Sequence, residues 1–217
     1  MTSASDKLPS DQSARRALRE DLDLIVDWFA DGSSVLDLGC GDGTLLAYLA
    51  EHRGCFGYGL EIDPANISRC IRRGVNVIEQ DLDYDDLSVF KDKSFDVVVM
   101  TQALQAVKRP DITLEQMLRI GREGIVTFPN FGYWRLRWYL WTKGRMPESR
   151  TLPYHWYDTP NIHLCTFKDF EALCEQLGIK ILRRSVVDDR HNAQWLSRLW
   201  PNAFGQIALY HITRQDA

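Results

Sequence analysis

The sequence predicts an α/β protein whose core is a doubly wound, mostly parallel sheet, and three observations lead to this class. Short apolar segments alternate with segments of helical periodicity between Ser34 and Phe128, which is the pattern of β–α–β units. Residues 95–100 form an apolar run of the kind expected for a strand buried on both faces. Residues 34–44 show an apolar strand that ends in closely spaced glycines, after which a helical pattern begins.

Each element follows from the local pattern. A first helix is expected to place Leu18, Leu22, Ile25 and Phe29 on one face. Asp63 and Pro64 predict the cap and first residue of a later helix, and Thr166 with Asp169 predicts a capping box. Strands are expected at 34–38, 55–62, 75–79, 95–100 and 125–128, followed by a C-terminal antiparallel hairpin at 179–187 and 206–212. The helices between the parallel strands are expected at 44–52, 64–73 and 113–120.

Length and composition bound the organisation of the chain. The 217 residues are 45% apolar and 26% charged, which favours one domain over residues 13–217 after a disordered tail at 1–12. An aromatic-rich insertion is expected at about 130–165. No apolar run approaches the roughly 20 residues of a membrane helix, and the polar start argues against export. Five cysteines without a Cys-x-x-Cys pair predict reduced thiols in a cytoplasmic protein and no metal site, and the net charge of −4 argues against nucleic acid as a partner.

The turn after the first strand indicates which small molecule it holds. The spacing Gly39-x-Gly41-x-Gly43 departs from the dinucleotide fingerprint, whose last glycine is Thr44 here. Asp37 and Asp42 would repel a pyrophosphate, because a like-charged pair at about 4 Å costs roughly 4 kcal/mol at an effective dielectric near 20. The same carboxylates favour a cation. The turn resembles the first motif of the class I methyltransferases, which use cationic S-adenosylmethionine (SAM), although a glycine turn without a ligand is the alternative.

Further residues are predicted to complete a pocket for SAM or S-adenosylhomocysteine. Glu61 ends the second strand 18 residues after Gly43, where a carboxylate can accept from ribose hydroxyls, unless it is a surface glutamate. The resemblance implies that Asp81 accepts from the adenine amino group and that Leu82 packs on the ring. The alternative for Asp81 is a solvated acidic run with Asp83, Asp85 and Asp86, and Ile62 is predicted either to pack on adenine or to join the core. The predicted cofactor-binding set is Asp37, Gly39, Cys40, Gly41, Gly43, Glu61, Ile62, Asp81, Leu82 and Thr101.

The segment after the fourth strand, where a methyl acceptor would be expected to bind, offers no obvious catalytic residue. The segment after the fourth strand lacks the D-P-P-Y motif of enzymes that methylate base amino groups, and Ala106 stands where many small-molecule methyltransferases place a histidine. No catalytic residue is therefore assigned, although positioning alone can support transfer to a nucleophilic acceptor. His155 and His163 are each predicted to be structural, with a role as a base as the alternative.

The insertion combines aromatic and basic residues. Trp134, Trp138 and Trp141 fall at i, i+4 and i+7, on one face of a helix, and arginines and lysines are interleaved with them. The pattern fits a lid over a substrate pocket, a protein interface, or stacking on RNA bases, while core packing of an inserted helix is a fourth interpretation. The acidic chain makes RNA the weakest of these.

The chain from about Arg15 to Ile212 resembles the methionine-biosynthesis protein MetW family. The resemblance depends on the strings at 81–83, 102–105, 128–135, 144–147 and 156–163. It implies a methyltransferase-like fold without an established methyl acceptor. It also implies an accessory or regulatory subunit that acts beside a homoserine O-acyltransferase, usually the acetyl-transferring type. The alternatives are an active SAM-dependent methyltransferase on a small metabolite and, more weakly, an RNA-modifying enzyme.

Overall fold

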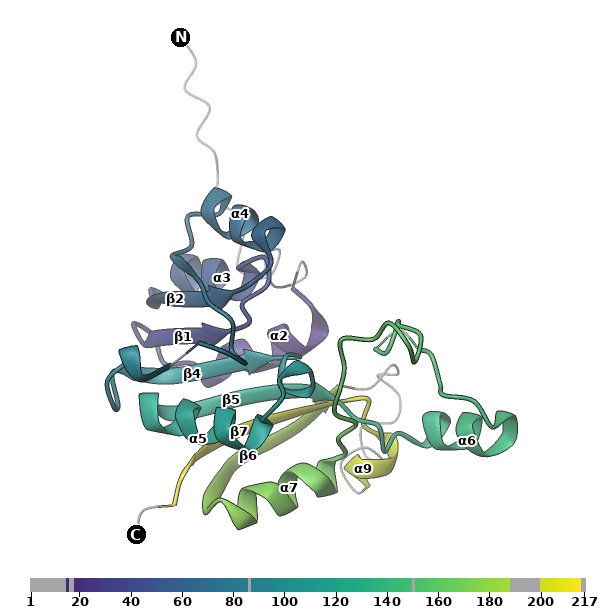
Figure 1. Ribbon diagram of the computed structural model, residues 1–217. Coiled ribbons are helices and arrows are strands. Elements are labelled where there is room, and N and C mark those ends of the chain that lie inside the picture. Colours follow the sequence, from purple (N-terminus) through teal and green to yellow (C-terminus); the bar gives the residue numbers. More distant parts are fainter. Residues whose placement is uncertain (1–14, 16–17, 86, 150, 188–199, 216–217) are drawn as a thin grey trace.

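A computed structural model describes residue 15 and residues 18–85, 87–149, 151–187 and 200–215 (Figure 1). One sheet of seven strands has the order β3-β2-β1-β4-β5-β7-β6, in which β7 runs in the direction opposite to the other six strands. The strands are β1 Ser34–Leu38, β2 Phe56–Glu61, β3 Val77–Glu79, β4 Phe95–Thr101, β5 Gly121–Pro129, β6 Ile179–Val187 and β7 Ile207–Arg214. The prediction of a doubly wound, mostly parallel sheet closed by an antiparallel hairpin is confirmed. The tail predicted at 1–12 lies outside the described residues, and the domain boundaries stay a prediction.

The helices lie in two layers, one on each face of the sheet. Helices α2, α3 and α4 pack on one face, and α5 and α7 pack on the other. The α-helices are α2 Glu20–Ile25, α3 Thr44–Arg53, α4 Pro64–Arg72, α5 Pro110–Ile120, α6 Trp134–Lys143, α7 Phe167–Gln176 and α9 Pro201–Phe204. Short 3-10 helices lie at Val26–Trp28, Leu87–Val89 and Leu104–Ala106. No helix in the part of the chain described here is long and apolar enough to cross a membrane.

Strand β4 shows why the core has two sides. Val97 and Val99 belong to the cluster under α2, α3 and α4, whereas Val98 and Met100 belong to the cluster under α5 and α7. Side chains alternate between the faces of a strand, so a strand that is covered on both faces needs apolar residues at consecutive positions. The apolar run in the sequence is therefore explained by burial on both sides.

Several predicted boundaries differ from the structure. The first helix is wrong in extent, because α2 ends at Ile25, a 3-10 turn follows, and Leu18 and Phe29 lie outside the α-helix. Strand β5 is longer than predicted, because its first residues pair with β4 although they are not apolar. The predicted caps are confirmed: the Asp63 side chain accepts from Ala65 N at 3.0 Å, and Thr166 and Asp169 form the capping box of α7.

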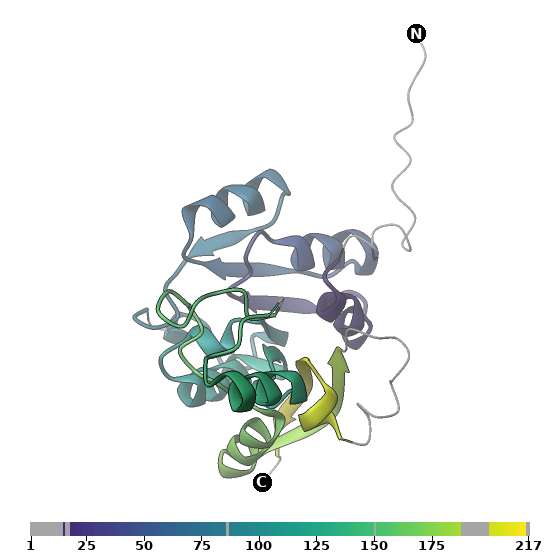
Figure 2. The ribbon, with the colours of Figure 1, turned by 90° about the vertical axis from the view of Figure 1, so that its right-hand side faces the viewer.

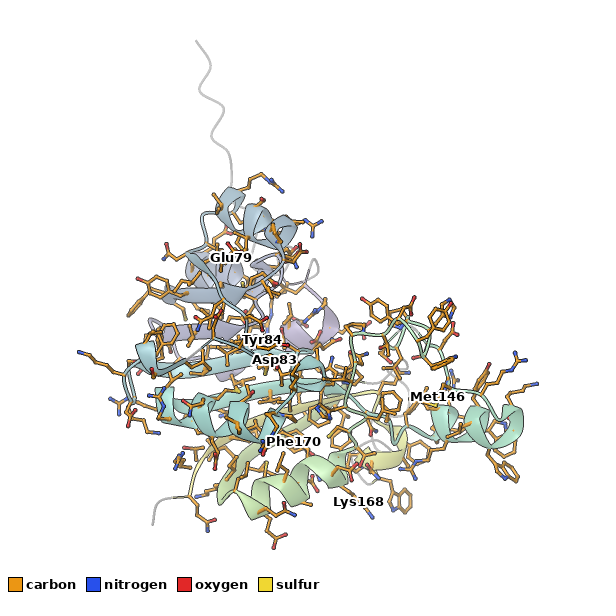
Figure 3. The ribbon with its side chains drawn as sticks, viewed as in Figure 1. Glu79, Asp83, Tyr84, Met146, Lys168 and Phe170 are labelled. Atoms are coloured by element: carbon orange, nitrogen blue, oxygen red, sulfur yellow. The ribbon has the colours of Figure 1, made fainter. Side chains whose placement is uncertain are left out.

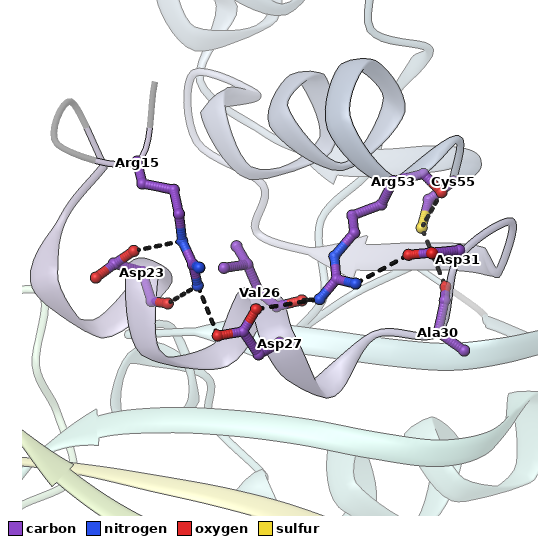
Figure 4. Close-up of polar contacts among 8 residues, drawn as sticks. All are labelled: Arg15, Asp23, Val26, Asp27, Ala30, Asp31, Arg53 and Cys55. Carbon is purple, nitrogen blue, oxygen red and sulfur yellow. Dashed lines mark hydrogen bonds and ion pairs between the residues drawn. The ribbon is translucent and has the colours of Figure 1, made fainter. Parts of the chain in front are cut away.

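Ion pairs fix α2 and its 3-10 extension to the end of α3 (Figure 4). Arg15 donates to Asp23 at 2.9 Å and to Asp27 at 2.7 Å. Arg53, at the end of α3, donates to Asp27 at 3.2 Å and to Asp31 at 2.9 Å. Each exposed pair contributes at most about 1 kcal/mol, but the shared Asp27 makes them one network that sets the position of α2.

The insertion departs from the sheet at one buried asparagine. Asn130 directly follows β5, and its side-chain amide donates to the carbonyl oxygens of Gly205 at 2.7 Å and Asn202 at 3.2 Å. The amide oxygen accepts from Gly132 N at 2.8 Å. A Cβ on Gly132 would lie within 3 Å of three polar atoms, so only glycine fits beside this side chain. Helix α6 follows and extends away from the sheet (Figure 1).

Candidate functional site

The turn at 39–43 adopts a conformation that requires its glycines. Gly39, Gly41 and Gly43 all have positive φ, of 73°, 57° and 76°. A Cβ at Gly43 would lie 2.9 Å from the Cys70 sulfur, and a Cβ at Gly39 would lie 3.1 Å from the Ala103 Cβ. A Cβ at Gly41, by contrast, would meet no atom within 4 Å. The backbone is therefore packed tightly from behind at two glycines and faces open space at the middle one.

Glu61 lies directly beside this turn, and its carboxylate is almost fully buried. One carboxylate oxygen accepts from Gly41 N at 2.8 Å, and the other accepts from the backbone N–H groups of Ile62 and Asp63 at 2.8 and 2.9 Å. The alternative of a surface glutamate is wrong. These bonds occupy three of about four acceptor positions of the carboxylate. A direct bond to ribose stays a prediction, and the structure adds a role in holding the turn.

Asp37 is the second acidic group of the site and is fully buried at the end of β1. Burial raises its pKa to about 7, with the charge of Glu61 adding to the shift and the charge of Arg19 opposing it. Its Oδ1 has no hydrogen-bond partner among the described residues. A buried carboxyl without a compensating bond is costly when ionised, and a nearby cation would lower that cost.

The structure corrects the interpretation of Asp42. Its carboxylate accepts from the Thr44 hydroxyl at 2.6 Å and pairs with the Arg73 guanidinium at 2.6 Å. Partial burial would raise the pKa of Asp42, but the bonds from Thr44 and Arg73 outweigh it and lower the pKa. Asp42 is thus neutralised within the protein, and Glu61 replaces it as the acidic partner of Asp37.

The predicted adenine side follows β2 and β3. Ile62 is 55% exposed, so its alternative placement in the core is wrong. Asp81 comes just after Gln80, whose N–H donates to the Glu61 carbonyl at 3.0 Å, so Asp81 lies at the same edge as Glu61. The Asp81 carboxylate accepts from Asp83 N at 2.8 Å, while Leu82 packs against the core. Adenine contacts by Ile62, Asp81 and Leu82 stay predictions.

The acidic run after β3 is only partly tied into the fold, because Asp83 is half-buried whereas Asp85 is exposed. The Asp83 carboxylate accepts from Lys108 N at 2.7 Å. The Lys108 ammonium lies 3.7 Å from the centre of the Tyr84 ring. Figure 3 labels Asp83 and Tyr84 near the middle of the view, over the sheet. The run therefore closes the site next to the segment that precedes α5.

The Cys40 side chain points away from the predicted ligand. Its sulfur lies 3.8 Å from the Cys70 sulfur, and a Cβ on Gly59 would come within 2.3 Å of it. Burial raises the pKa of the Cys40 thiol, so it is neither a nucleophile nor a charged ligand at neutral pH. Any contact with a ligand would involve the Cys40 backbone, whose N–H donates to Leu60 O at 3.0 Å.

Arg19 and Asp21, at the start of α2, also lie at this edge of the sheet. The sequence did not predict either residue as part of the site. Arg19 donates to Thr101 Oγ1 at 3.2 Å and forks onto the buried Asp21 carboxylate with two contacts of 3.2 Å. Asp21 also accepts from Gln102 at 2.9 Å and from Thr127 at 3.2 Å. Arg19 and Asp21 are about 80 residues from Thr101 in sequence, so no local spacing reveals them.

A cavity of about 580 Å³ opens beside this ion pair. Arg19, Asp21 and Gln105 line one side, and Tyr154, Pro160 and Asn161 of the insertion line the other. The Gln105 side chain donates to the Asn161 side chain at 3.2 Å, and the backbone N–H of His163 donates to the Gln105 carbonyl oxygen at 3.0 Å. The later part of the insertion thus forms one wall of the cavity, and its role as a lid stays a prediction.

The two predicted histidines make structural contacts. The His163 ring contacts the Lys108 carbonyl at 3.2 Å and ties the insertion to the segment after β4. His155 is exposed, pairs with Glu148 at 2.9 Å and stacks on Tyr157. The bond and the charge of Glu148 raise the pKa of His155. Neither residue is among those that line the cavity beside Arg19.

The site residues fit a cationic ligand with hydroxyl groups. Asp37, Glu61, Asp81 and Thr101 lie at the carboxyl ends of β1, β2, β3 and β4, four adjacent strands of the sheet. Ligands of open α/β sheets bind at this edge. An unpartnered buried carboxyl oxygen on Asp37 and open space at Gly41 match a sulfonium compound better than a pyrophosphate.

Comparison with known protein families agrees with this interpretation of the fold. Residues 19–212 match the family described as "Methionine biosynthesis protein MetW". This chain belongs to the MetW family. The match runs from before β1 into β7 and includes Arg19, Asp21 and all ten predicted cofactor-binding residues.

A relative from Rhodopirellula baltica joins a MetW part to a second protein. The relative is named bifunctional methionine biosynthesis protein MetXA/MetW, and it is 36% identical to this chain over 189 residues. The aligned part is 83% of this chain and 30% of the relative. The chain spans 30 to 37% of the length of the curated relatives it matches.

Solved structures show the same fold. A SAM-dependent methyltransferase from Thermotoga maritima matches with a TM-score of 0.65 and 16% identity, covering 94% of this chain and 92% of that chain. The cyclase SpnF matches with a TM-score of 0.62 and 17% identity, covering 95% and 83%. A fold that serves both a methyltransferase and a cyclase does not by itself specify methyl transfer.

Proposed function

We propose that this chain is an accessory or regulatory subunit of a homoserine O-acyltransferase, of the acetyl-transferring type, in methionine synthesis. The observation that carries the proposal is the relative in which MetXA, the homoserine O-acetyltransferase, shares one chain with a MetW part. Fusion keeps two modules at high effective concentration, which favours parts that work in contact. We expect the two proteins to meet in the cytoplasm.

We also propose that the chain retains a pocket for SAM or S-adenosylhomocysteine. Asp37 would face the positive end of the ligand, Glu61 the ribose, and Asp81, Ile62 and Leu82 the adenine. SAM supplies an electrophilic methyl group on a sulfonium when it is bound. The glycine turn, held from behind by Glu61 and Cys70, supports the pocket because its open side is preformed.

The test of the accessory role is acyl transfer to homoserine by the cognate acyltransferase, with and without an equimolar amount of this chain. We expect a clear increase in rate with the chain present. An equimolar, unrelated SAM-dependent methyltransferase is the matched control, because it shares the fold. No increase with both proteins folded and mixed at micromolar concentration would reject the accessory role.

Ligand binding could link this subunit to the output of its pathway, because SAM is made from methionine. We propose that SAM changes the affinity of this chain for the acyltransferase. Thermodynamic linkage then requires the acyltransferase to change the affinity for SAM by the same factor. Titration of each ligand at saturating amounts of the other measures both factors, and two factors equal to one would reject the regulation.

A methyltransferase acting on a small metabolite is the second candidate. The cavity beside Arg19 and Asp21 favours it, because a polar cavity next to Thr101 could hold an acceptor. Asp21 is nevertheless fully bonded to Arg19, Gln102 and Thr127, which makes it a poor general base. Transfer of labelled methyl groups into a cell extract would support this candidate, and the same extract without the chain is the control.

A further inference from the structure

Helix α6 is attached to the rest of the protein by little apolar contact. Leu136 is the only residue that is buried among Trp134–Lys143. It packs in a small cluster with Tyr133 and Leu152, apart from the two clusters of the sheet. Figure 1 shows the helix standing out from the body, and in Figure 2 the helix lies in front, toward the viewer. Core packing, the fourth interpretation of the aromatic pattern, is therefore wrong for this helix.

The insertion carries half of the exposed large apolar side chains. Residues 130–165 hold eleven of the 22 such side chains among the described residues, although they are about a sixth of the chain. Trp138 and Trp141 are 57% and 76% exposed, and their rings meet edge to face at 5.0 Å. Trp134, on the same helical face, is 44% exposed. Large exposed apolar patches mark interaction sites, and Trp and Arg are the residues enriched at binding hot spots.

The charge of α6 is opposite in sign to that of the whole chain. The helix contains Arg135, Arg137 and Lys143 and no acidic residue, whereas the chain has a net charge of −4. None of these three side chains pairs with a carboxylate among the residues that the structure describes. Arg135 lies 5.5 Å from the centre of the Trp134 ring. The aromatic face therefore carries unpaired positive charge at its border.

We propose that α6 docks on the homoserine O-acyltransferase, with Trp134, Trp138 and Trp141 entering an apolar groove that is bordered by carboxylates. This step rests on the accessory function proposed above, and it adds the surface and the chemistry of the contact. An acidic border is required because Arg135, Arg137 and Lys143 have no carboxylate partner among the described residues and would otherwise lose their hydration without compensation. The helix is preformed, so docking need not order it.

Two other occupants fit the observations less well. A second copy would bring an identical helix with three positive charges, and a symmetric contact would place like charges together. A bilayer surface would accept tryptophans and basic residues, but the helix has only 10 residues. Both occupants are outcomes of the experiment below.

The first experiment compares binding of purified chains to the cognate acyltransferase by sedimentation velocity and calorimetry. We expect wild-type binding, and at least roughly 30-fold weaker binding for Trp138→Ala with Trp141→Ala, the change typical of hot-spot residues. Phe56→Ala with Tyr58→Ala is the matched control, because these β2 side chains are 66% and 45% exposed at the other end of the sheet. Equal melting temperatures of all variants would show that they are folded.

The second experiment reverses charges. Arg135→Glu with Lys143→Glu should slow association and reduce its dependence on salt. Lys168→Glu, at an exposed position on α7 (Figure 3), is the control and should change neither quantity. Equal association rates for the α6 variant and wild type would contradict an acidic border on the partner.

The outcomes separate this inference from the proposed function. If wild type does not bind the acyltransferase, the accessory function fails and the inference fails with it. If wild type binds and both α6 variants bind equally well, the function stands and the inference is overturned. Self-association of the chain alone, or binding to phosphatidylglycerol vesicles, that only the α6 variants lose would assign α6 to another occupant and overturn it as well.

Discussion

The turn at 39–43 and helix α6 differ in how many of their apolar and polar groups find partners within the chain. In the turn, Glu61, Arg73 and Cys70 fill the space behind the backbone, and nearly every polar group there has a partner. On α6 the large apolar groups face solvent and the cations have no described carboxylate partner. The turn is completed by the chain itself, whereas α6 is left to be completed by another surface. The two segments should therefore respond to substitution in opposite ways.

The largest expected effect is at the closed side of the turn. Gly43→Ala should lower the free energy of unfolding by about 3 kcal/mol, because it adds left-handed strain and a Cβ 2.9 Å from the Cys70 sulfur. Gly41→Ala, which meets no atom, should cost about 1 kcal/mol. Urea unfolding measures both. Equal losses of unfolding free energy in the two variants would contradict the difference in packing between Gly43 and Gly41.

The junction between sheet and insertion should be nearly as sensitive. Asn130→Ala removes three hydrogen bonds of a buried side chain and should cost about 2 to 3 kcal/mol. It should also speed proteolysis within residues 131–165. Asn76→Ala, an exposed side chain with one bond of 3.2 Å to Gly57, is the control and should cost less than about 1 kcal/mol. Unchanged proteolysis would show that Asn130 does not hold the insertion.

The buried carboxyl of Asp37 beside the turn should make the free energy of unfolding depend on pH. The folded pKa of Asp37, about 7, lies above the value of 3.8 that is normal for aspartate, so wild-type stability should fall as pH rises from about 4 to about 7. Asp37→Asn should remove this fall and be about 2 kcal/mol more stable at pH 8. Asp42→Asn is the opposite control, because its pKa is lowered by Thr44 and Arg73 and its loss should destabilise at neutral pH. Denaturation at pH 4 to 8 decides the sign for each.

The same titration should appear in ligand binding. Ionised Asp37 attracts a cation, so SAM affinity should rise severalfold between pH 6 and pH 8 in wild type and stay flat in Asp37→Asn. Calorimetry at both pH values measures this. A flat wild-type profile would place the positive end of the ligand away from Asp37.

The smallest expected effect is on α6. Trp138→Ala with Trp141→Ala should change stability by less than about 0.5 kcal/mol, because neither ring is buried. Leu136→Ala on the same helix should cost about 2 kcal/mol, because it empties the small cluster with Tyr133 and Leu152. A large loss in the tryptophan variant would mean that α6 is completed from within the chain after all.

Local spacing explains which parts of the molecule could be predicted. The glycine turn, the caps of α4 and α7 and the two-sided burial of β4 each depend on neighbouring residues, and the structure contains all of them. Pairs between distant segments could not be predicted. Arg73 neutralises Asp42 from the end of α4, and Arg19 and Asp21 reach the site from α2. The tryptophans had a helical period, but a period alone does not distinguish a buried face from an exposed one.

The position of β7 between β5 and β6 constrains the order in which the chain can assemble. Among the strands that the structure describes, β6 pairs with β7 alone, so it cannot join the sheet until synthesis has passed residue 214. The edge that carries Asp37, Glu61 and Asp81 uses only β1 to β4, which are complete at residue 101. During translation these four strands therefore emerge first, but the core cluster on their α5 and α7 face is completed only by residues that are made later. The segment 134–165 emerges in that interval, with its tryptophans exposed before the closing strand arrives.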